Sequence, residues 1–271
     1  MWIDQSLPQD HAITGMNLKL EKFVKTLSEE GYNGIEIMLG NPFNFNVKEA
    51  IDIIYDSKLE VSQLCTGEFW GSYNVCLNDI DTKAYAKAIL WGEQVINFAS
   101  VLNCSVNIGR FRGKVWEDGF KNSMNRMVNS FRHLDKKAKE QGIELLIEPL
   151  RSNICDNLNS VSEAAEFIHN TGLQSFYLMI DTDHTSIEEI EYIQNKFSSI
   201  KYIHLADTMH APLGEGTILF SKYFKLFKSL RYDGYIGIEV FSNNQDRNIV
   251  QKSISYLKRF IQKEDGQWNY K

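Results

Sequence analysis

Four side chains able to bind a metal stand at the ends of short apolar runs in the second half of the chain. They are Glu148 after the run LLI, Asp181 after LMI, His204 after KYI and Glu239 after YIGI. A carboxylate at the end of a buried strand is unfavourable unless something compensates its charge, and one divalent cation shared by four such groups would compensate all of them. The pattern predicts one converging metal site.

Three carboxylates and one imidazole form a hard, oxygen-rich ligand set. Mn²⁺ is the expected ion, with Mg²⁺, Co²⁺ or Zn²⁺ as alternatives. Such an ion polarises a carbonyl, so that the neighbouring C–H becomes acidic, and a base must then take that proton. Two glutamates on different strands, Glu148 and Glu239, could face each other across a substrate, one removing a proton and the other returning one. This is the apparatus for isomerising or epimerising an α-hydroxy ketone.

The same residues also have a structural interpretation. A single glutamate at a strand end is most often a cap or half of an ion pair, and a lone histidine in an apolar strand is usually a core residue. Four such residues at equivalent positions are harder to explain in this way. The spacing alone leaves the metal site and the structural interpretation about equally supported.

The secondary-structure elements that must position these residues follow a regular order. Short apolar runs alternate along the chain with longer amphipathic stretches. The predicted strands are Gly34–Leu39, Val61–Gly67, Cys104–Arg110, Glu144–Leu150, Phe176–Thr182, Lys201–Asp207, Tyr235–Phe241 and, weakly, Trp2–Leu7. The predicted helices are Asn17–Gly31, Thr82–Leu102, Asp118–Gln141, Ser160–Thr171, Ser221–Leu230 and Gln245–Gln262. Nearly continuous apolar strands are typical of a parallel sheet covered on both faces.

The alternation predicts the α/β class and a single closed (β/α)8 TIM barrel spanning residues 1–271. An open doubly wound sheet is the alternative, but no glycine-rich phosphate loop follows any strand. In a barrel the active site lies at the carboxyl ends of the strands, which is where the four candidate ligands fall.

Composition narrows the class of partner. A net charge of −6 and a pI near 5.6 argue against nucleic acid, and no segment is apolar enough to span a membrane. The four cysteines do not have the spacing of metal ligands, and we expect them to be reduced. No signal peptide is visible in the sequence, so a cytoplasmic location is expected. A small molecule is the expected partner. The sequence does not decide the oligomeric state, and a homo-oligomer is among the states it permits.

The segments IEPLRSNICDNLNS, MIDTDHTSIEE, YIHLADTMHAPLGEG and GYIGIEV resemble the sugar isomerase/epimerase barrels related to xylose isomerase, closest to the branch that contains D-tagatose 3-epimerase. The resemblance continues more faintly upstream, through LCTG and VNIGRFRGK. It implies a sugar substrate and assigns the metal to the four residues named above. It also makes Glu148 and Glu239 the two acid/base groups, and gives His184 to substrate binding.

The chain departs from that family at two positions near the expected substrate. Ile154 stands where a substrate-binding glutamate is expected, and His210 stands where the epimerases carry a substrate-binding arginine. His210 is therefore expected to contact substrate as a shorter donor. Losing a carboxylate that receives sugar hydroxyls would cost about 1–3 kcal/mol per unpaired group, so a free ketohexose is a weaker candidate than a different or unusual sugar. Arg110 and Arg112 are candidate substrate-binding residues, because with Lys114 they bring three cations to the predicted mouth and could bind a phosphate or carboxylate; the alternative is a solvated loop with ordinary surface charge.

Three other functions remain to be weighed. A metal-dependent dehydratase of a cyclic polyol or keto acid could use the same proton abstraction on the same barrel. A barrel that binds a sugar or protein without catalysis is suggested by Ile154 and His210, although a pure binder has no need of two opposed bases. A phosphodiesterase of the endonuclease IV type is least favoured, because its extra zinc ligands come from early strands and only His11 and His133 precede Glu148.

Overall fold

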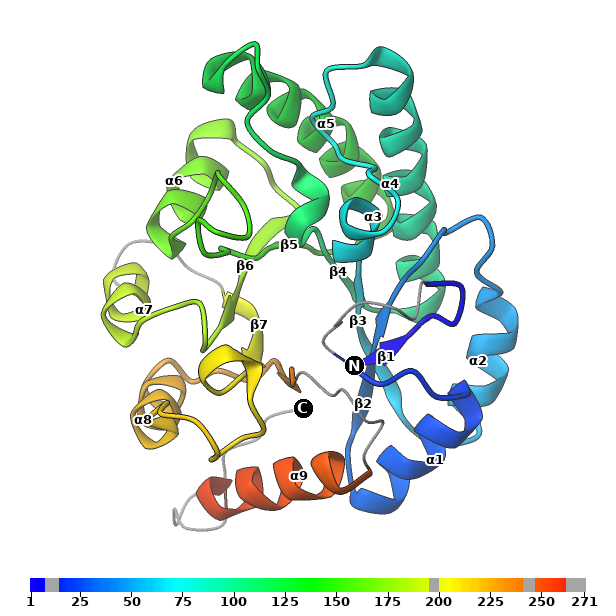
Figure 1. The fold of residues 1–271 in the computed structure, drawn as a ribbon, viewed down its shortest axis with the longest axis vertical. Coiled ribbons are helices and arrows are strands. Elements are labelled where there is room, and N and C mark those ends of the chain that lie inside the picture. The colour runs from blue at the N-terminus through cyan, green and yellow to red at the C-terminus, as the bar shows by residue number, and fades with distance from the viewer. Residues whose placement is uncertain (8–14, 195–199, 241–246, 262–271) are drawn as a thin grey trace.

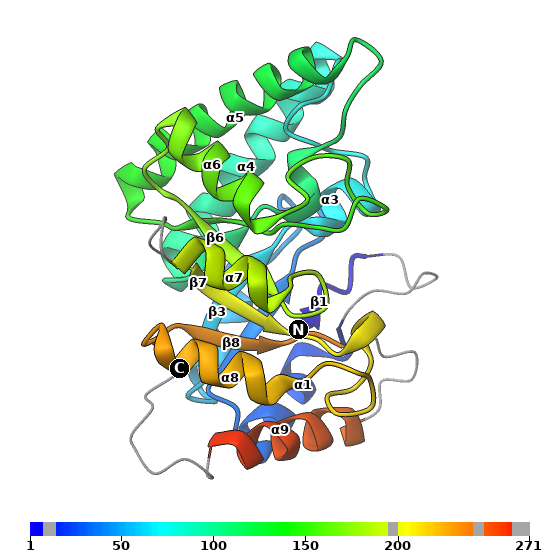
Figure 2. The ribbon, with the colours of Figure 1, turned by 90° about the vertical axis from the view of Figure 1, so that its left-hand side faces the viewer.

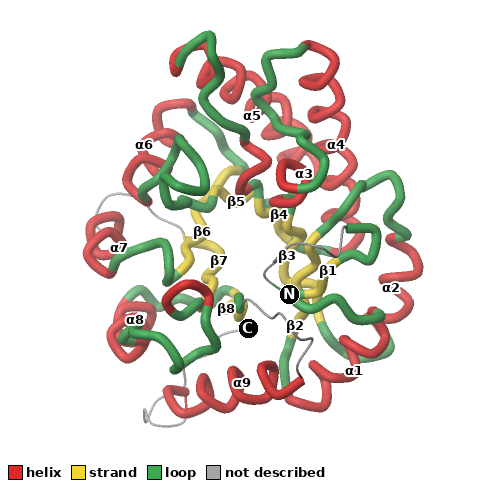
Figure 3. The backbone as a smooth tube through the Cα atoms, in the orientation of Figure 1, coloured by secondary structure: helices red, strands yellow, loops and turns green. Residues whose placement is uncertain are grey.

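Eight parallel strands form one sheet that curls into a barrel, with the helices arranged around it (Figures 1 and 3). This computed structural model describes residues 1–7, 15–194, 200–240 and 247–261. The strands follow one another in sequence order around the sheet, each hydrogen-bonded to the next from β1 to β8. The predicted α/β barrel is therefore confirmed. Among the described helices, none is long and apolar enough to cross a membrane.

The strands are short and lie close to the predicted ranges. They are β1 Trp2–Ile3, β2 Gly34–Met38, β3 Glu60–Cys65, β4 Ser105–Asn107, β5 Leu145–Ile147, β6 Phe176–Asp181, β7 Ile200–Leu205 and β8 Tyr235–Ile238. The first strand, weakly predicted as Trp2–Leu7, is the shortest and covers only Trp2–Ile3. The predicted end of the last strand, Phe241, lies outside the described residues.

The helices are α1 Leu20–Glu30, α2 Val47–Tyr55, α3 Gly67–Gly71, α4 Thr82–Leu102, α5 Phe120–Gln141, α6 Val161–Thr171, α7 Ile187–Gln194, α8 Phe220–Ser229 and α9 Arg247–Ile261, with 3-10 turns η1 Gly109–Arg112 and η2 Thr208–His210. In the side view, α7 and α8 cover β6, β7 and β8 (Figure 2). Helices α2, α3 and α7 were not among the predicted ones. The predicted bounds of α9, Gln245 and Gln262, lie outside the described residues.

The ends of the helices determine where the strands that carry the site begin. Helix α5 ends at Gly142, whose φ of 70° is the left-handed conformation that glycine adopts without steric cost. The amide of Ile143 then donates to Ala138 O, and β5 begins two residues later. After β5, a capping box between Ser160 and Glu163 starts α6.

Strand periodicity places the polar residues inside the barrel. Side chains alternate between the two faces of a strand, so Asp181 shares a face with Met179, and His204 with Tyr202. Met179 and Tyr202 form, with Leu146, a buried cluster separate from the large cluster that packs the strands against the helices. The candidate ligands therefore lie in the next inward-facing layer along these strands, toward their carboxyl ends.

The barrel has a seam between its last and first strands. The outer edge of β1 is occupied by a local segment, in which the amide of Ile3 donates to Met16 O and Trp2 pairs with Met16 in parallel. Within the part of the chain that the structure describes, β8 has no ladder to β1.

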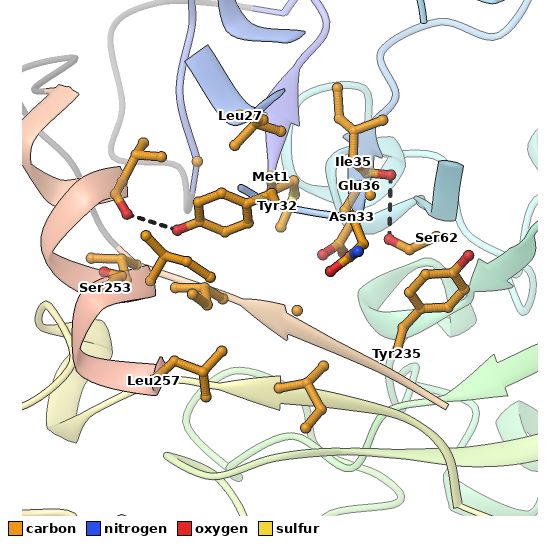
Figure 4. A pocket seen from close by; sticks show the side chains of 18 of the residues that line it. Met1, Leu27, Tyr32, Asn33, Ile35, Glu36, Ser62, Tyr235, Ser253 and Leu257 are labelled. Atoms are coloured by element: carbon orange, nitrogen blue, oxygen red, sulfur yellow. Dashed lines mark hydrogen bonds between the residues drawn. The ribbon is translucent and has the colours of Figure 1, made fainter. Parts of the chain in front are cut away.

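A cavity of about 170 Å³ fills the seam, bounded mainly by apolar side chains of α1, α9, β2 and β8 (Figure 4). At one side the hydroxyl of Tyr32 donates to Val250 O at 2.8 Å, which ties the chain after α1 to α9. Glu36 and Tyr202 also line this cavity, so it reaches the inner face of the barrel.

Candidate metal centre

The structure brings the four strand-end residues together. Glu148 follows β5 directly, Asp181 ends β6, His204 lies in β7 and Glu239 follows β8 directly. Each is buried, and one ligand atom from each lies within 4.8 Å of those of the other three. The carboxyl ends of four neighbouring strands thus form one buried group of three carboxylates and one imidazole.

His204 Nδ1 faces the three carboxylates. It lies 2.8 Å from Glu239 Oε2, 3.8 Å from Glu148 Oε1 and 3.9 Å from Asp181 Oδ2. Among the described residues, neither His204 Nδ1 nor Asp181 Oδ2 has a hydrogen-bond partner. Protein atoms bound at about 2.1 Å to one ion lie roughly 3 to 4 Å from each other, so these separations and unpartnered atoms fit a bound divalent cation.

A fifth buried carboxylate, Glu36 in β2, stands behind His204. Its Oε2 lies 3.0 Å from His204 Nε2, and its Oε1 accepts from Gln63 Nε2 at 2.8 Å and from the thiol of Cys65. A carboxylate at Nε2 assigns the imidazole proton to that nitrogen, which leaves the Nδ1 lone pair directed at the other three carboxylates. Glu36 was missed from the sequence, where its one signal was a charge within the apolar run GIEIM.

The carboxylates of the group are held by further hydrogen bonds. Asn107 in β4 donates through Nδ2 to Glu148 Oε2 at 2.9 Å. The amide of Asp183 donates to Asp181 Oδ1 at 2.6 Å, so that the unpartnered Oδ2 faces the centre. These contacts orient one oxygen of Glu148 and one oxygen of Asp181 inward. Asn107 was also missed from the sequence, because an amide in a strand carries no charge signal.

The charges of the group are strongly coupled. Burial disfavours the imidazolium of His204, but the carboxylates of Glu36 and Glu239 outweigh burial and raise its pKa well above the usual value. Burial likewise opposes ionisation of Glu239, yet His204 and His210 hold its pKa well below the usual value. For Asp181 burial prevails and raises the pKa. Without a cation, protons on the imidazoles balance the carboxylates, and a divalent ion would bind in competition with those protons.

Replacing Glu36 with Gln tests whether the Glu36 carboxylate orients His204 for metal binding. The amide cannot hold the Nε2 proton as a carboxylate does, so we expect the Kd for Mn²⁺ to rise by about 10 to 100-fold, as for other groups that orient a metal-binding histidine. Equilibrium dialysis with Mn²⁺ measures it. Asp52→Asn, on the exposed face of α2, is the matched control and should leave the Kd unchanged. Equal Kd values for Glu36→Gln and the parent would show that Glu36 does not position His204.

The group opens into a cavity of about 260 Å³. Its walls include both glutamates of the group, apolar side chains such as Met38 and Leu150, and several of the residues predicted to contact substrate. Those predicted residues are His184, His210 and Arg110, and Ile154 also lines the cavity. Ile154 is 40% exposed, and it faces this cavity and the adjoining one.

The predicted cationic loop does not form one anion site. Arg110 lines the cavity but is paired with the buried Glu68, whose Oε1 lies 2.5 Å from Nη2. Lys114 lies over the rings of Trp70 and Trp116, with Nζ 5.7 and 4.4 Å from their centroids. The charges of this loop are thus directed to different neighbours.

Arg112 corrects the expectation that it contacts substrate. Its side chain is fully buried, and its guanidinium donates to the carbonyls of Gly109 and Glu148 and to Asn157 Oδ1. A buried guanidinium must satisfy its donors within the protein, and here backbone oxygens and an amide do so. Arg112 therefore supports the backbone at Glu148 and is not part of the cavity wall.

Comparison with known proteins agrees with the fold. The profile of the xylose isomerase-like TIM barrel family matches residues 24–260. The ketose 3-epimerase of Arthrobacter globiformis is 24% identical over 232 residues, which are 82% of this chain and 77% of that protein. The 3-dehydro-D-guloside 4-epimerase of Escherichia coli is 24% identical over 232 residues, covering 81% of this chain and 86% of that protein.

Among solved structures, the D-allulose 3-epimerase of Methylomonas sp. in complex with D-allulose superposes with a TM-score of 0.77 at 20% identity, covering 89% of this chain and 90% of that one. At this identity the likeness establishes the barrel. The chemistry has to be argued from the residues of the site.

Proposed function

Because the chain belongs to the xylose isomerase-like TIM barrel family, we propose that it is a divalent-metal-dependent sugar isomerase or epimerase of the ketose 3-epimerase kind. One observation carries the proposal: two buried glutamates, from strands separated by two others, line one cavity and lie within 4.8 Å of an aspartate and a histidine that complete a metal-binding set. Relatives whose names are ketose or L-ribulose 3-epimerases support the same reaction class.

Glu148, Asp181, His204 and Glu239 would hold the cation, with Mn²⁺ as the expected ion. Bound there, the ion supplies electrophilic polarisation of a substrate carbonyl, which increases the acidity of the neighbouring C–H. The donor set fits this role, because three carboxylates neutralise a divalent charge in a buried site and the imidazole is oriented by Glu36.

Glu148 and Glu239 would move the protons. One carboxylate takes the proton from the carbon beside the ketone, leaving an enediolate. The other, in its carboxylic acid form, returns a proton to the opposite face of that carbon, so the configuration there is inverted and no atom is gained or lost. Hydrogen bonds hold each in place for this: Asn107 Nδ2 holds Glu148, and the amide of Glu239 donates to Leu205 O at 3.0 Å.

The other residues of the cavity wall would bind the substrate and determine the specificity for it. His184 and Arg110 offer donors to sugar hydroxyls, whereas Ile154 offers an apolar surface. A sugar with a substituted or missing hydroxyl at that point therefore fits better than a free ketohexose, whose hydroxyl would be left unpaired. We propose a small sugar-like ketone of this kind as the substrate, with no role for nucleic acid.

A panel of free and substituted ketoses, assayed with added Mn²⁺ or Co²⁺, tests the proposal. We expect epimerisation or isomerisation with kcat/KM higher for a substituted sugar than for its free parent. Ile154→Glu should reverse this order and raise kcat/KM for the free ketohexose by about tenfold, because a carboxylate can accept its hydroxyls. Ile154→Gln, of similar length without the charge, is the control. Absence of turnover across the panel with either ion would contradict the proposal.

A further inference from the structure

His210 lies against the same carboxylates as His204. It ends η2, the turn that follows β7, and its side chain is 8% exposed. Its Nε2 lies 3.5 Å from Asp181 Oδ2 and also 3.5 Å from Glu239 Oε2. Both oxygens belong to the four-residue group, and both also face His204 Nδ1. Two imidazoles thus approach the same pair of oxygens from β7 and from the turn after it.

A buried carboxylate stands behind His210, as Glu36 stands behind His204. Asp183 Oδ2 lies 3.4 Å from His210 Nδ1. Asp183 is itself fixed, because its Oδ1 accepts from Arg151 Nη2 at 2.8 Å and from the amide of Met209 at 3.0 Å. A carboxylate at one imidazole nitrogen directs the other nitrogen toward a metal, and here that other nitrogen, Nε2, faces Asp181.

The backbone holds His210 in this position against its own preference. Met209 and His210 have φ values of 58° and 54°, a left-handed conformation that costs about 1 kcal/mol or more per residue outside glycine. The loop that follows is clamped by the fully buried Asp207, which accepts from the amides of Gly214, Gly216 and Ile218. The backbone that carries His210 and the loop that follows it are therefore held by the protein's own contacts.

We propose that His210 is a fifth protein ligand of the cation held by Glu148, Asp181, His204 and Glu239, bound through Nε2. The inference rests on the metal site of the proposed function and revises the sequence-based expectation that His210 contacts substrate. Its separations from Asp181 and Glu239 fall within the roughly 3 to 4 Å expected between ligands of one ion.

A second ion is the competing arrangement. Asp181, His184 and His210 also bring one ligand atom each within 4.8 Å, and the two imidazole centroids are 5.2 Å apart. A single ion is supported by the position of His210 Nε2, which lies 3.5 Å from an oxygen of Asp181 and 3.5 Å from an oxygen of Glu239, both members of the four-residue group.

The fifth ligand has a consequence for the substrate. Ions such as Mn²⁺ and Co²⁺ commonly take six ligands, so five from the protein leave one position, where four would leave two. The sugar would then bind the ion through one oxygen, with its other oxygens held by protein donors.

Counting bound imidazoles tests the proposal without measuring activity. Metal-free protein is titrated with Co²⁺, and the strongly shifted, solvent-exchangeable imidazole N–H protons are counted by ¹H NMR at one ion per chain. We expect two such protons, on His204 Nε2 and His210 Nδ1, and one in His210→Ala. His184→Ala is the matched control and should retain two. Competition with a chelating dye should show the Kd for Co²⁺ raised about tenfold or more in His210→Ala.

The other outcomes are distinct. One shifted proton in the parent at one bound ion would overturn the role of His210 and leave the four-ligand site intact. Two ions per chain, with His184→Ala binding only one, would replace the proposal by the two-ion arrangement. No Co²⁺ binding at all would overturn the metal site and with it the proposed function. Circular dichroism of His210→Arg, which keeps a cation beside Asp181 and Glu239, shows whether loss of binding reflects loss of the fold.

Discussion

Glu148→Gln and Glu239→Gln variants should each lose about 10³-fold in kcat. General acid–base catalysis by one positioned group contributes about 10²–10⁴-fold, and an amide of the same shape can neither take nor return a proton. Initial rates on the best substrate of the ketose panel measure the loss. Glu144→Gln provides the matched control, because Glu144 precedes β5 at the end away from the site and pairs with Lys201 on the surface.

Deuterium exchange separates the two bases. In D₂O, a variant with one base left should exchange the proton of one epimer with solvent while failing to convert it into the other epimer. The two variants should exchange opposite epimers, because the carboxylates act on opposite faces of the carbon. If either variant kept its kcat within tenfold of the parent, or if both exchanged the same epimer, the two-base mechanism would be wrong.

Removing the cation should abolish turnover and lower thermal stability. At a free Mn²⁺ concentration of about 100 times Kd, binding to the folded state alone adds about 2.7 kcal/mol to the free energy of unfolding. For a chain of this size that corresponds to a rise of about 5 to 10 °C in Tm. Differential scanning calorimetry of metal-free protein, with and without Mn²⁺, measures the shift.

Asp181→Asn is the variant that isolates the effect of the ion on Tm. The amide keeps the shape of the side chain but loses the negative charge at the most deeply buried carboxylate of the group. Its Tm should therefore respond to Mn²⁺ by less than half the shift of the parent. Activity that survives exhaustive chelation, with a Tm indifferent to Mn²⁺, would argue for a barrel that works without a metal.

The sequence predicted those site residues whose signal lies within one short segment of the chain. Asp181 and His204 were found because a charged or titratable residue at the end of an apolar run is visible in one short segment, and parallel strands bring such ends together. Glu36 could not be found in the same way. Its role depends on His204, 168 residues away along the chain, and on the register that places β2 across the barrel from β7.

The sequence also did not predict the direction in which individual side chains point. Arg110 and Arg112 are two residues apart in one turn, yet the first reaches the cavity and the second is fully buried beneath it. Spacing predicts how many cations a loop carries, but the turn η1 decides where each points. For Ile154 the resemblance to the family did provide a position, and the structure places that side chain in the cavity wall.

The seam would give a bound cation a mechanical role in addition to its proposed chemical one. In the described part of the chain β8 is an edge strand, held by its ladder to β7 alone, because the segment at Met16 takes the outer edge of β1. Glu239 emerges from this edge strand, whereas Glu148 emerges from β5 in the interior of the sheet. An ion shared by both would crosslink this edge strand to an interior strand, and would add to the β7 ladder and the amide of Glu239 that already hold one of the two bases in register.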